Sequence, residues 1–191
     1  MALPSFAVVD LETSGLSTRR HRVLQIGLVV VEADGTVLDE WDTLVRLGWP
    51  LQRVGPTELH GITRRSLKGA PALDAALDEL GARLVGSIFT AHNAAFDAGF
   101  LARATRRRPA TDPVRSGIEP SLCTLRMSRC LDPLRERSHR LVDVCERYDV
   151  RLDRPHDALA DAAATAAVLP HLLRAHGIST VDQLSPFYVT P

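Results

Sequence analysis

The chain has 191 residues, of which 45% are hydrophobic and 24% are charged, so it is an ordinary globular chain rather than a disordered or fibrous one. Its 23 basic and 23 acidic residues cancel, and net charge therefore does not indicate a nucleic-acid partner. No apolar run approaches the about 18 residues of a membrane span, and MALPSFAVVD lacks the regions of a signal peptide, so we expect a cytoplasmic domain.

The first half of the chain is rich in strand signals. Residues 5–10, SFAVVD, are a short apolar run that ends in an acid, which predicts a buried strand. Residues 22–47 contain two β-rich runs around Asp34-Gly35, and this turn sequence predicts a β-hairpin. A loop rich in glycine and proline follows and ends in ELHGIT, residues 58–63.

Helical spacing begins after this loop. Apolar residues recur three or four positions apart at Leu73, Ala76, Leu77, Leu80 and Leu84. Residues 87–92, SIFTAH, predict another strand, and Asn93 can then cap a helix. The side chains of this helix expected to face inward are Phe96, Phe100 and Ala104. Residues 107–120 contain three prolines and predict a loop, and SLCTL at 121–125 predicts a last strand.

Three helices complete the expected domain. The first lies near residues 125–131, the second is capped by Ser138, and the third runs from Asp157 to about His171, where Pro170 should kink or end it. The tail after Gly177 looks semi-ordered. A hairpin followed by helices indicates a mixed α/β sheet with helices on its faces.

Acidic residues stand at the ends of three of these elements. In DLETSGL, residues 10–16, strand alternation places Asp10 and Glu12 on the same side. Two carboxylates so placed repel each other unless a cation lies between them. Asp97 stands between two phenylalanines in HNAAFDAGF, on the face of its helix that should be buried.

The third acidic site is HDALAD, residues 156–161. Asp161 lies on the expected last helix, and His156 precedes it by five residues. At about 100° per residue the two would not share a helical face. We therefore expect His156 to stand just before the helix, free to turn toward the same cleft.

Four carboxylates and one imidazole fit one kind of chemistry. Oxygen ligands suit Mg²⁺ or Mn²⁺, and two such ions about 4 Å apart can stabilise both oxygens of a phosphoryl displacement. A neutral histidine can take the proton of the attacking water. Each residue alone also has a simple structural interpretation, as a capping acid, a surface acid or a loop histidine.

Taken in order, DLETSGL, HNAAFD and HDALAD resemble the three motifs of the DEDD exonuclease superfamily, in its histidine-bearing DEDDh branch. The resemblance covers about residues 5–175 and is strongest to DnaQ-like proteins, typified by the proofreading ε subunit of bacterial DNA polymerase III. It implies a ribonuclease H-like α/β fold with a five-stranded mixed sheet flanked by helices. The exonuclease domain would span residues 1–176, with a tail over 177–191.

The resemblance also implies an activity and its residues. The activity is hydrolysis from the 3′ end of nucleic acid, with single-stranded or frayed DNA the expected substrate, in proofreading or repair. Two divalent cations, Mg²⁺ or Mn²⁺, would be bound by four carboxylates: Asp10, Glu12, Asp97 and Asp161. His156 would be the general base.

Further residues are implied to contact the substrate. Thr13 and the backbone after it would hold the 3′-terminal nucleotide, and Leu16 would wedge against the terminal base. His60, His92 and Asn93 would line the same pocket. Structural interpretations stay open here, because Leu16 could belong to the core and His60 could stabilise its loop.

Two other functions stay open. One is an RNA-processing exoribonuclease of the same superfamily, since sugar discrimination needs contacts to the 2′-OH. The other is a non-catalytic module that binds a polymerase or sliding clamp, because Gln183–Phe187, QLSPF, loosely resembles a clamp-binding pentapeptide with Pro186 in place of leucine. Arginine clusters at residues 19–22 and 103–108 are equally open to interpretation as solvated loops. No membrane partner is expected.

Overall fold

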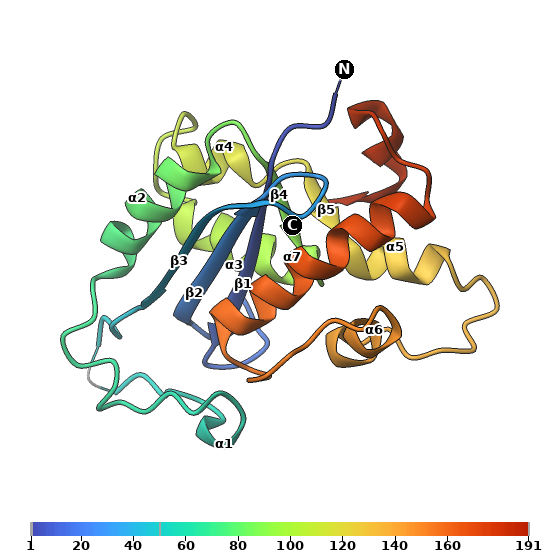
Figure 1. The fold of residues 1–191 in the computed structure, drawn as a ribbon. Helices are drawn as coiled ribbons and strands as arrows, with labels where there is room; N and C mark the ends of the chain where they lie inside the picture. The colour runs from blue at the N-terminus through green and yellow to red at the C-terminus, as the bar shows by residue number, and fades with distance from the viewer. Residues whose placement is uncertain (1, 50, 191) are drawn as a thin grey trace.

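The computed structural model describes residues 2–49 and 51–190 and forms a mixed sheet with helices on both faces (Figure 1). The ends of the expected domain and tail, Met1 and Pro191, and Pro50 of the expected loop lie outside this range. The strands are ordered β3-β2-β1-β4-β5-β6. Their bounds are β1 Phe6–Thr13, β2 Val23–Val31, β3 Val37–Leu44, β4 Ile88–Ala91, β5 Ser121–Cys123 and β6 Tyr188–Val189.

The sheet is mixed, as the resemblance implied. β1 is antiparallel to β2, and β2 to β3 through the predicted hairpin, while β1, β4 and β5 are parallel neighbours. At the hairpin turn, Gly35 has a φ of +98°, and the Asp34 carboxylate accepts a hydrogen bond from the Thr36 N–H at 2.8 Å. The turn chemistry of Asp-Gly therefore joins the two strands as expected.

The helices divide between the two faces of the sheet. Their bounds are α1 Thr57–His60, α2 Leu73–Leu84, α3 Ala94–Thr105, α4 Pro113–Gly117, α5 Thr124–Cys130, α6 Leu141–Arg147 and α7 Ala158–Ala175. α2 and α3 contribute to one apolar core, and α5, α6 and α7 to the other. No helix in the described part of the chain is long and apolar enough to cross a membrane.

Alternation along β1 decides which face receives each side chain. Ala7, Val9 and Leu11 belong to the core beneath α2 and α3, whereas Phe6 and Val8 belong to the core beneath α7. Because successive side chains point to opposite faces, Asp10 and Glu12 continue the row of Phe6 and Val8. Both carboxylates therefore face α7. The strand is also longer than the predicted 5–10, since it runs on to Thr13.

The tail is where the fold departs most from expectation. Residues Val181–Phe187 form a 3₁₀ helix, η1, and Tyr188–Val189 pair antiparallel with β5. The sheet consequently has six strands rather than the five implied by the resemblance. Leu184 and Phe187 are buried against the α7 core, and the Phe187 ring lies 4.5 Å from that of His176. Burial of these two apolar side chains orders the segment that we expected to be semi-ordered.

Helix boundaries account for the remaining differences. α7 continues past Pro170 to Ala175, and the buried proline packs beside the hairpin turn at Gly35, which offsets the hydrogen bond that proline cannot donate. The expected loop at 107–120 contains α4, capped by the Asp112 carboxylate, which accepts from the Arg115 N–H at 3.0 Å. The N-cap of α6 is Arg140, not Ser138.

Candidate active site

The candidate site forms where β1 extends beyond the end of its parallel neighbour, β4. β4 pairs with β1 only as far as the Val8–Thr90 pair, and the chain then turns into α3 at Ala94. The second half of β1 is therefore flanked by the first turn of α3 instead of a strand. This arrangement brings Asp97 of α3 beside the stretch of β1 that carries Asp10 and Glu12.

Asp97 is the most deeply buried of the four acids, with 4% of its surface exposed. Burial raises its pKa to about 8, the neighbouring Glu12 carboxylate adds to the rise, and backbone N–H groups of Asp97 and Leu11 partly oppose it. The placement of an acid between two phenylalanines is thus a feature of the site. The rings of Phe96 and Phe100 pack against each other in a tilted arrangement with centroids 5.0 Å apart, and Asp97 points to β1.

α7 packs against the sheet at unusually close range, at Gly27 of β2. Gly27 is paired with Asp10 across the sheet, and a Cβ at Gly27 would lie 2.3 Å from the backbone carbonyl of Ala158. Only glycine permits this approach. Gln25, opposite Glu12, completes it by accepting a hydrogen bond from the Ala158 N–H at 3.4 Å. The first turn of α7, with Asp161, is thereby held against the two acids of β1.

Each of these carboxyl groups has a raised pKa. For Asp10 burial is the largest cause, followed by the charges of Asp97, Asp161 and Glu12. Burial and the charges of Asp161 and Asp157 raise the pKa of Glu12 to about 7. The pKa of Asp161 is raised chiefly by burial, against the effect of the His156 backbone N–H. We call Asp10, Glu12, Asp97 and Asp161 the carboxylate site.

His156 stands before α7, as expected, and not on it. α7 begins at Ala158, and the exposed His156 has a φ of +66°, in the left-handed region. Its backbone N–H donates to Asp161 Oδ2 at 3.1 Å, which fixes the residue beside the carboxylate site. Ligand atoms of Glu12, His156 and Asp161 all lie within 4.8 Å of one another.

The residues present fit a divalent cation. Four acids converge in a partly buried site in which each of three groups raises the pKa of Asp10, and a cation would relieve this repulsion. Asp161 Oδ1 is buried and has no hydrogen-bond partner among the described residues, an arrangement that an ion or its bound water would satisfy. Oxygen donors of this kind suit Mg²⁺ or Mn²⁺.

Leu16 and Thr13 lie on or beside the β1–β2 loop at the mouth of the site. Leu16 is 84% exposed, so its interpretation as a core residue is wrong. Thr13 is buried, and its hydroxyl donates to the Gly15 carbonyl at 2.9 Å. That hydrogen bond shapes the loop so that Leu16 projects into solvent at its tip.

The three remaining substrate candidates differ from one another. His60 is buried, its Nδ1 accepts from the Ile62 N–H at 3.0 Å, and its Nε2 has no partner among the described residues. Burial lowers the pKa of His60. The charge of His156 also acts on His60, so the two imidazoles lie near each other.

His92 and Asn93 stand at the turn from β4 into α3. Both ring nitrogens of His92 have internal partners, the Thr124 hydroxyl at 3.0 Å and the His139 carbonyl at 2.9 Å, which favours a structural role. Asn93 is the N-cap residue, but its exposed side chain makes no capping hydrogen bond within residues 2–49 and 51–190. It is consequently the freer of the two to contact a ligand.

Fold and site together are those of an exonuclease domain, and comparison with known proteins agrees. Residues 7–169 match the RNase_T family, described as exonuclease, and the chain belongs to this family. The DNA polymerase III PolC-type of Streptococcus thermophilus (strain ATCC BAA-491 / LMD-9) is 34% identical over 185 residues, covering 95% of this chain. That of Halalkalibacterium halodurans is 32% identical over 169 residues, covering 88%. The chain spans only 12% and 11% of these two relatives.

Solved structures share the fold. Exonuclease X in complex with 5′ overhanging duplex DNA aligns with a TM-score of 0.69 at 24% identity, covering 95% of this chain and 98% of that one. The nuclease domain of 3′hExo, a DEDDh family member bound to rAMP, aligns with a TM-score of 0.73 at 14% identity, covering 92% and 94%. The expected ribonuclease H-like fold is confirmed, with one additional strand.

Proposed function

We propose that the chain hydrolyses phosphodiester bonds from the 3′ end of nucleic acid, with single-stranded or frayed DNA as its substrate. The observation that carries this proposal is the convergence of four acids with raised pKa values beside an exposed histidine. Membership in an exonuclease family supplies the reaction class. The direction of digestion, the substrate and the role of each residue are our inference.

Asp10, Glu12, Asp97 and Asp161 would hold two divalent cations, Mg²⁺ or Mn²⁺, which supply charge stabilisation for the attacking and leaving oxygens. His156 takes the proton from the attacking water through its exposed ring, because its backbone is fixed by Asp161 while its side chain faces solvent. Burial of Asp97 excludes water from the far side of the site. Activation of water is thereby confined to the side where His156 stands.

The 3′ terminus would be held at the β1–β2 loop. Leu16, exposed on this loop, would wedge against the terminal base, while Thr13, His60 and Asn93 would line the pocket beside it. His92 would support the pocket from behind, through its hydrogen bonds. Single strands would be preferred, since unpairing a terminal nucleotide from a duplex costs a few kcal/mol.

DNA is the favoured substrate because the PolC-type relatives are named as DNA polymerase III. An RNA substrate remains the second candidate, since one of the structural neighbours is titled for recognition of a histone mRNA stem-loop by a 3′-exonuclease. At 14% identity that neighbour shares the fold alone. The choice between DNA and RNA depends on contacts to the sugar 2′-OH, so digestion of matched DNA and RNA strands distinguishes the two.

A role limited to binding a polymerase or clamp is less well supported. In the QLSPF segment, Leu184 and Phe187 are buried in the α7 core, and Gln183 accepts hydrogen bonds from the backbone of Ser179 and Thr180. A clamp could take these side chains only after η1 unfolded. Four converging acids with raised pKa values would also serve no purpose in such a module.

The test is digestion of end-labelled strands by the purified chain. A 16-nucleotide DNA labelled at the 5′ end should shorten one nucleotide at a time in Mg²⁺, whereas the same strand labelled at the 3′ end should release labelled mononucleotide at once. Matched RNA and a duplex with a mismatched 3′ end identify the substrate. Cutting of a circular single strand, or shortening from the 5′ end, would contradict the proposal.

A further inference from the structure

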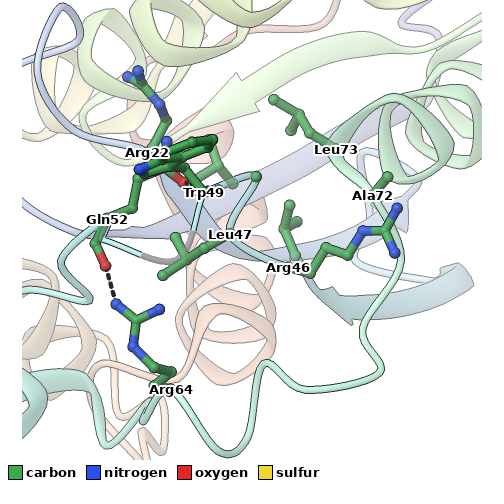
Figure 2. A pocket seen from close by; sticks show the side chains of 11 residues that line it. Arg22, Arg46, Leu47, Trp49, Gln52, Arg64, Ala72 and Leu73 are labelled. Carbon is green, nitrogen blue, oxygen red and sulfur yellow. Dashed lines mark hydrogen bonds between the residues drawn. The ribbon is translucent and has the colours of Figure 1, made fainter.

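Two pockets adjoin each other beside the β1–β2 loop, outside the carboxylate site. One has a volume of about 570 Å³ and the other of about 320 Å³, and they share Arg22, Val23 and Leu73 in their walls. The larger is built from the loop, the end of β3 and the chain before α2 (Figure 2). The smaller is closed by the C-terminal half of α3. They form one continuous hollow surface.

Arginine dominates the charge of this surface. The guanidinium groups that line it are those of Arg22, Arg46, Arg64, Arg103, Arg106 and Arg107, which we call the arginine band. No aspartate or glutamate of the described residues lines either pocket, and none forms an ion pair with a member of the band. In a chain whose net charge is zero, these charges are concentrated on one surface.

Some basic residues elsewhere in the chain are paired with acids. Arg108 adjoins Arg107 in sequence but forms ion pairs with Asp74, Asp78 and Asp112. A third basic pocket, beside His92, contains Arg140, which is paired with Asp143. Its His139 likewise contacts Asp132 at 3.1 Å. Unlike Arg108 and Arg140, the arginines of the band retain charges that are free to bind an anion.

An exposed aromatic side chain lies within the band. Trp49 lines the larger pocket with 63% of its surface exposed, near Arg22, Arg46 and Arg64 (Figure 2). The Arg64 guanidinium donates to the Gln52 carbonyl, which orders the chain beside Trp49. Guanidinium groups that bind phosphates, combined with an aromatic ring on which bases stack, are the two elements of single-stranded nucleic-acid binding.

The band begins beside the carboxylate site. Ser14 follows Thr13 at the end of β1, and it is tied to Arg22 twice: the Ser14 N–H donates to the Arg22 carbonyl at 2.9 Å, and the Ser14 hydroxyl accepts from the Arg22 N–H at 3.0 Å. Arg22 is thus fixed to Ser14, which lies two residues beyond Glu12. On the other side, Phe100 of the smaller pocket stacks on Phe96, next to Asp97.

We propose that the arginine band binds the sugar–phosphate backbone of the substrate strand on the 5′ side of the nucleotide being removed, with a base stacked on Trp49. The proposal rests on the proposed exonuclease function, since it places the 3′ end at the carboxylate site. Its consequence is a preference for strands long enough to reach from that site into the two pockets. A few terminal nucleotides would occupy the carboxylate site alone.

Binding of fluorescein-labelled (dT)16 and (dT)4 tests this, measured by anisotropy in Mg²⁺ on an Asp161→Asn background that prevents digestion. Two double variants remove charge from one pocket each, Arg46→Ala/Arg64→Ala and Arg103→Ala/Arg107→Ala. The matched control, Arg126→Ala/Arg174→Ala, removes two exposed arginines outside the band; Arg174 lies about 20 Å along α7 from Asp161 at 1.5 Å per residue.

Each band variant should weaken (dT)16 binding about tenfold or more at low salt. The slope of log K against log salt should become shallower by about 1.4, or about 0.7 for each lost phosphate contact. The control should match the parent, and (dT)4 binding should change less than about twofold in all variants. (rU)16 shows whether the band accepts RNA as well. Quenching of tryptophan fluorescence by (dT)16 should be lost in Trp49→Phe and retained in Trp41→Phe.

Outcomes for the two proposals are separable. If the wild-type chain digests strands but the band variants bind (dT)16 with the affinity and salt slope of the control, the arginine band is not a strand-binding surface. Equal loss for (dT)4 and (dT)16 would overturn it too. If the band variants lose (dT)16 binding while the wild-type chain digests nothing, the band binds single strands, but the exonuclease proposal and the placement of the 3′ end at the carboxylate site both fail.

Discussion

The carboxylate site and the arginine band lie on either side of the β1–β2 loop, and their charges differ both in sign and in burial. The acids are partly or deeply buried, and burial and mutual repulsion raise their pKa values, to about 7 for Glu12 and about 8 for Asp97. The arginines are exposed and have no acidic partner in the described residues. Buried charges of one sign require a bound counter-ion, whereas exposed charges act on a partner through contacts that salt screens.

In our proposals this difference assigns hydrolysis to the carboxylate site and strand binding to the arginine band. A buried anionic site repels the phosphates of its own substrate unless cations are present, so it needs another surface to attract the strand. The band supplies that attraction without any group that could carry out hydrolysis. Changes at the carboxylate site should therefore affect turnover, and changes at the band should affect affinity and its dependence on salt.

The largest effect is expected from the carboxylate site itself. Asp161→Asn keeps an oxygen to accept the His156 N–H but removes a charge needed to hold cations. Digestion should fall by about 10³-fold or more, because cations at such sites contribute several kcal/mol to the transition state. EDTA should abolish it in the wild type. Rates within tenfold of wild type for this variant, at saturating Mg²⁺, would exclude Asp161 as a ligand.

A somewhat smaller loss is expected for His156→Ala. Removing a positioned general base costs about 10²–10⁴-fold in turnover, while (dT)16 binding should stay within about twofold because neither the acids nor the band is altered. Turnover is measured under single-turnover conditions, with binding measured by anisotropy. If binding falls in parallel with turnover, His156 contacts the substrate and is not the base.

Gly27→Ala should damage the site indirectly. The new Cβ would lie 2.3 Å from the Ala158 backbone, so α7 must move away from β2 and from the acids of β1. Overpacking of this kind lowers the free energy of unfolding by about 1–3 kcal/mol, and displacement of Asp161 by about 1 Å can reduce turnover up to 10²-fold. Gly117→Ala is the control, since its Cβ would meet Leu84 at an ordinary 3.4 Å and Gly117 lines neither pocket of the band. Denaturant unfolding and digestion rates of both variants test whether Gly27→Ala alone loses stability and turnover.

The smallest effect concerns the stability of the metal-free protein. Because the pKa of Asp97 is raised to about 8 in the folded state from about 3.9 in the unfolded state, the folded state binds more protons between these values. Its contribution to stability is fully present below about pH 4 and is lost as the pH rises toward 8. In EDTA, the melting temperature should fall from pH 5 to pH 9, and less steeply in Asp97→Asn. Equal slopes would contradict the raised pKa.

Much of the site could be predicted because its chemistry resides in residue types at fixed order. Asp10, Glu12, Asp97, His156 and Asp161 were all identified from three short motifs, and the structure brings them to one edge of the sheet. The strand and helix pattern was likewise readable from alternation and turn residues. What the motifs could not supply was the packing that holds them at the right separation.

Gly27 and Gln25 are examples of residues whose packing role the motifs do not reveal. Their roles appear only when α7 is placed against β2, although a glycine within the apolar run QIGLVVV was an available signal for close backbone approach. The arginine band was only partly visible for a similar reason, since the clusters at residues 19–22 and 103–108 join with Arg46 and Arg64 only in the fold. The sixth strand was missed because Pro186 and a short apolar run gave no strand pattern.

The central claim is that four partly or deeply buried carboxylates form a divalent-cation site, and calorimetric titration of the metal-free chain with Mn²⁺ tests it most directly. At pH 7 the wild type should bind Mn²⁺ with release of protons, because carboxyl groups such as those of Glu12 and Asp97, whose pKa values are about 7 and about 8, must ionise to act as ligands. Asp161→Asn should bind more weakly. Absence of Mn²⁺ binding by the folded wild-type chain, or the same isotherm from both proteins, would contradict the account.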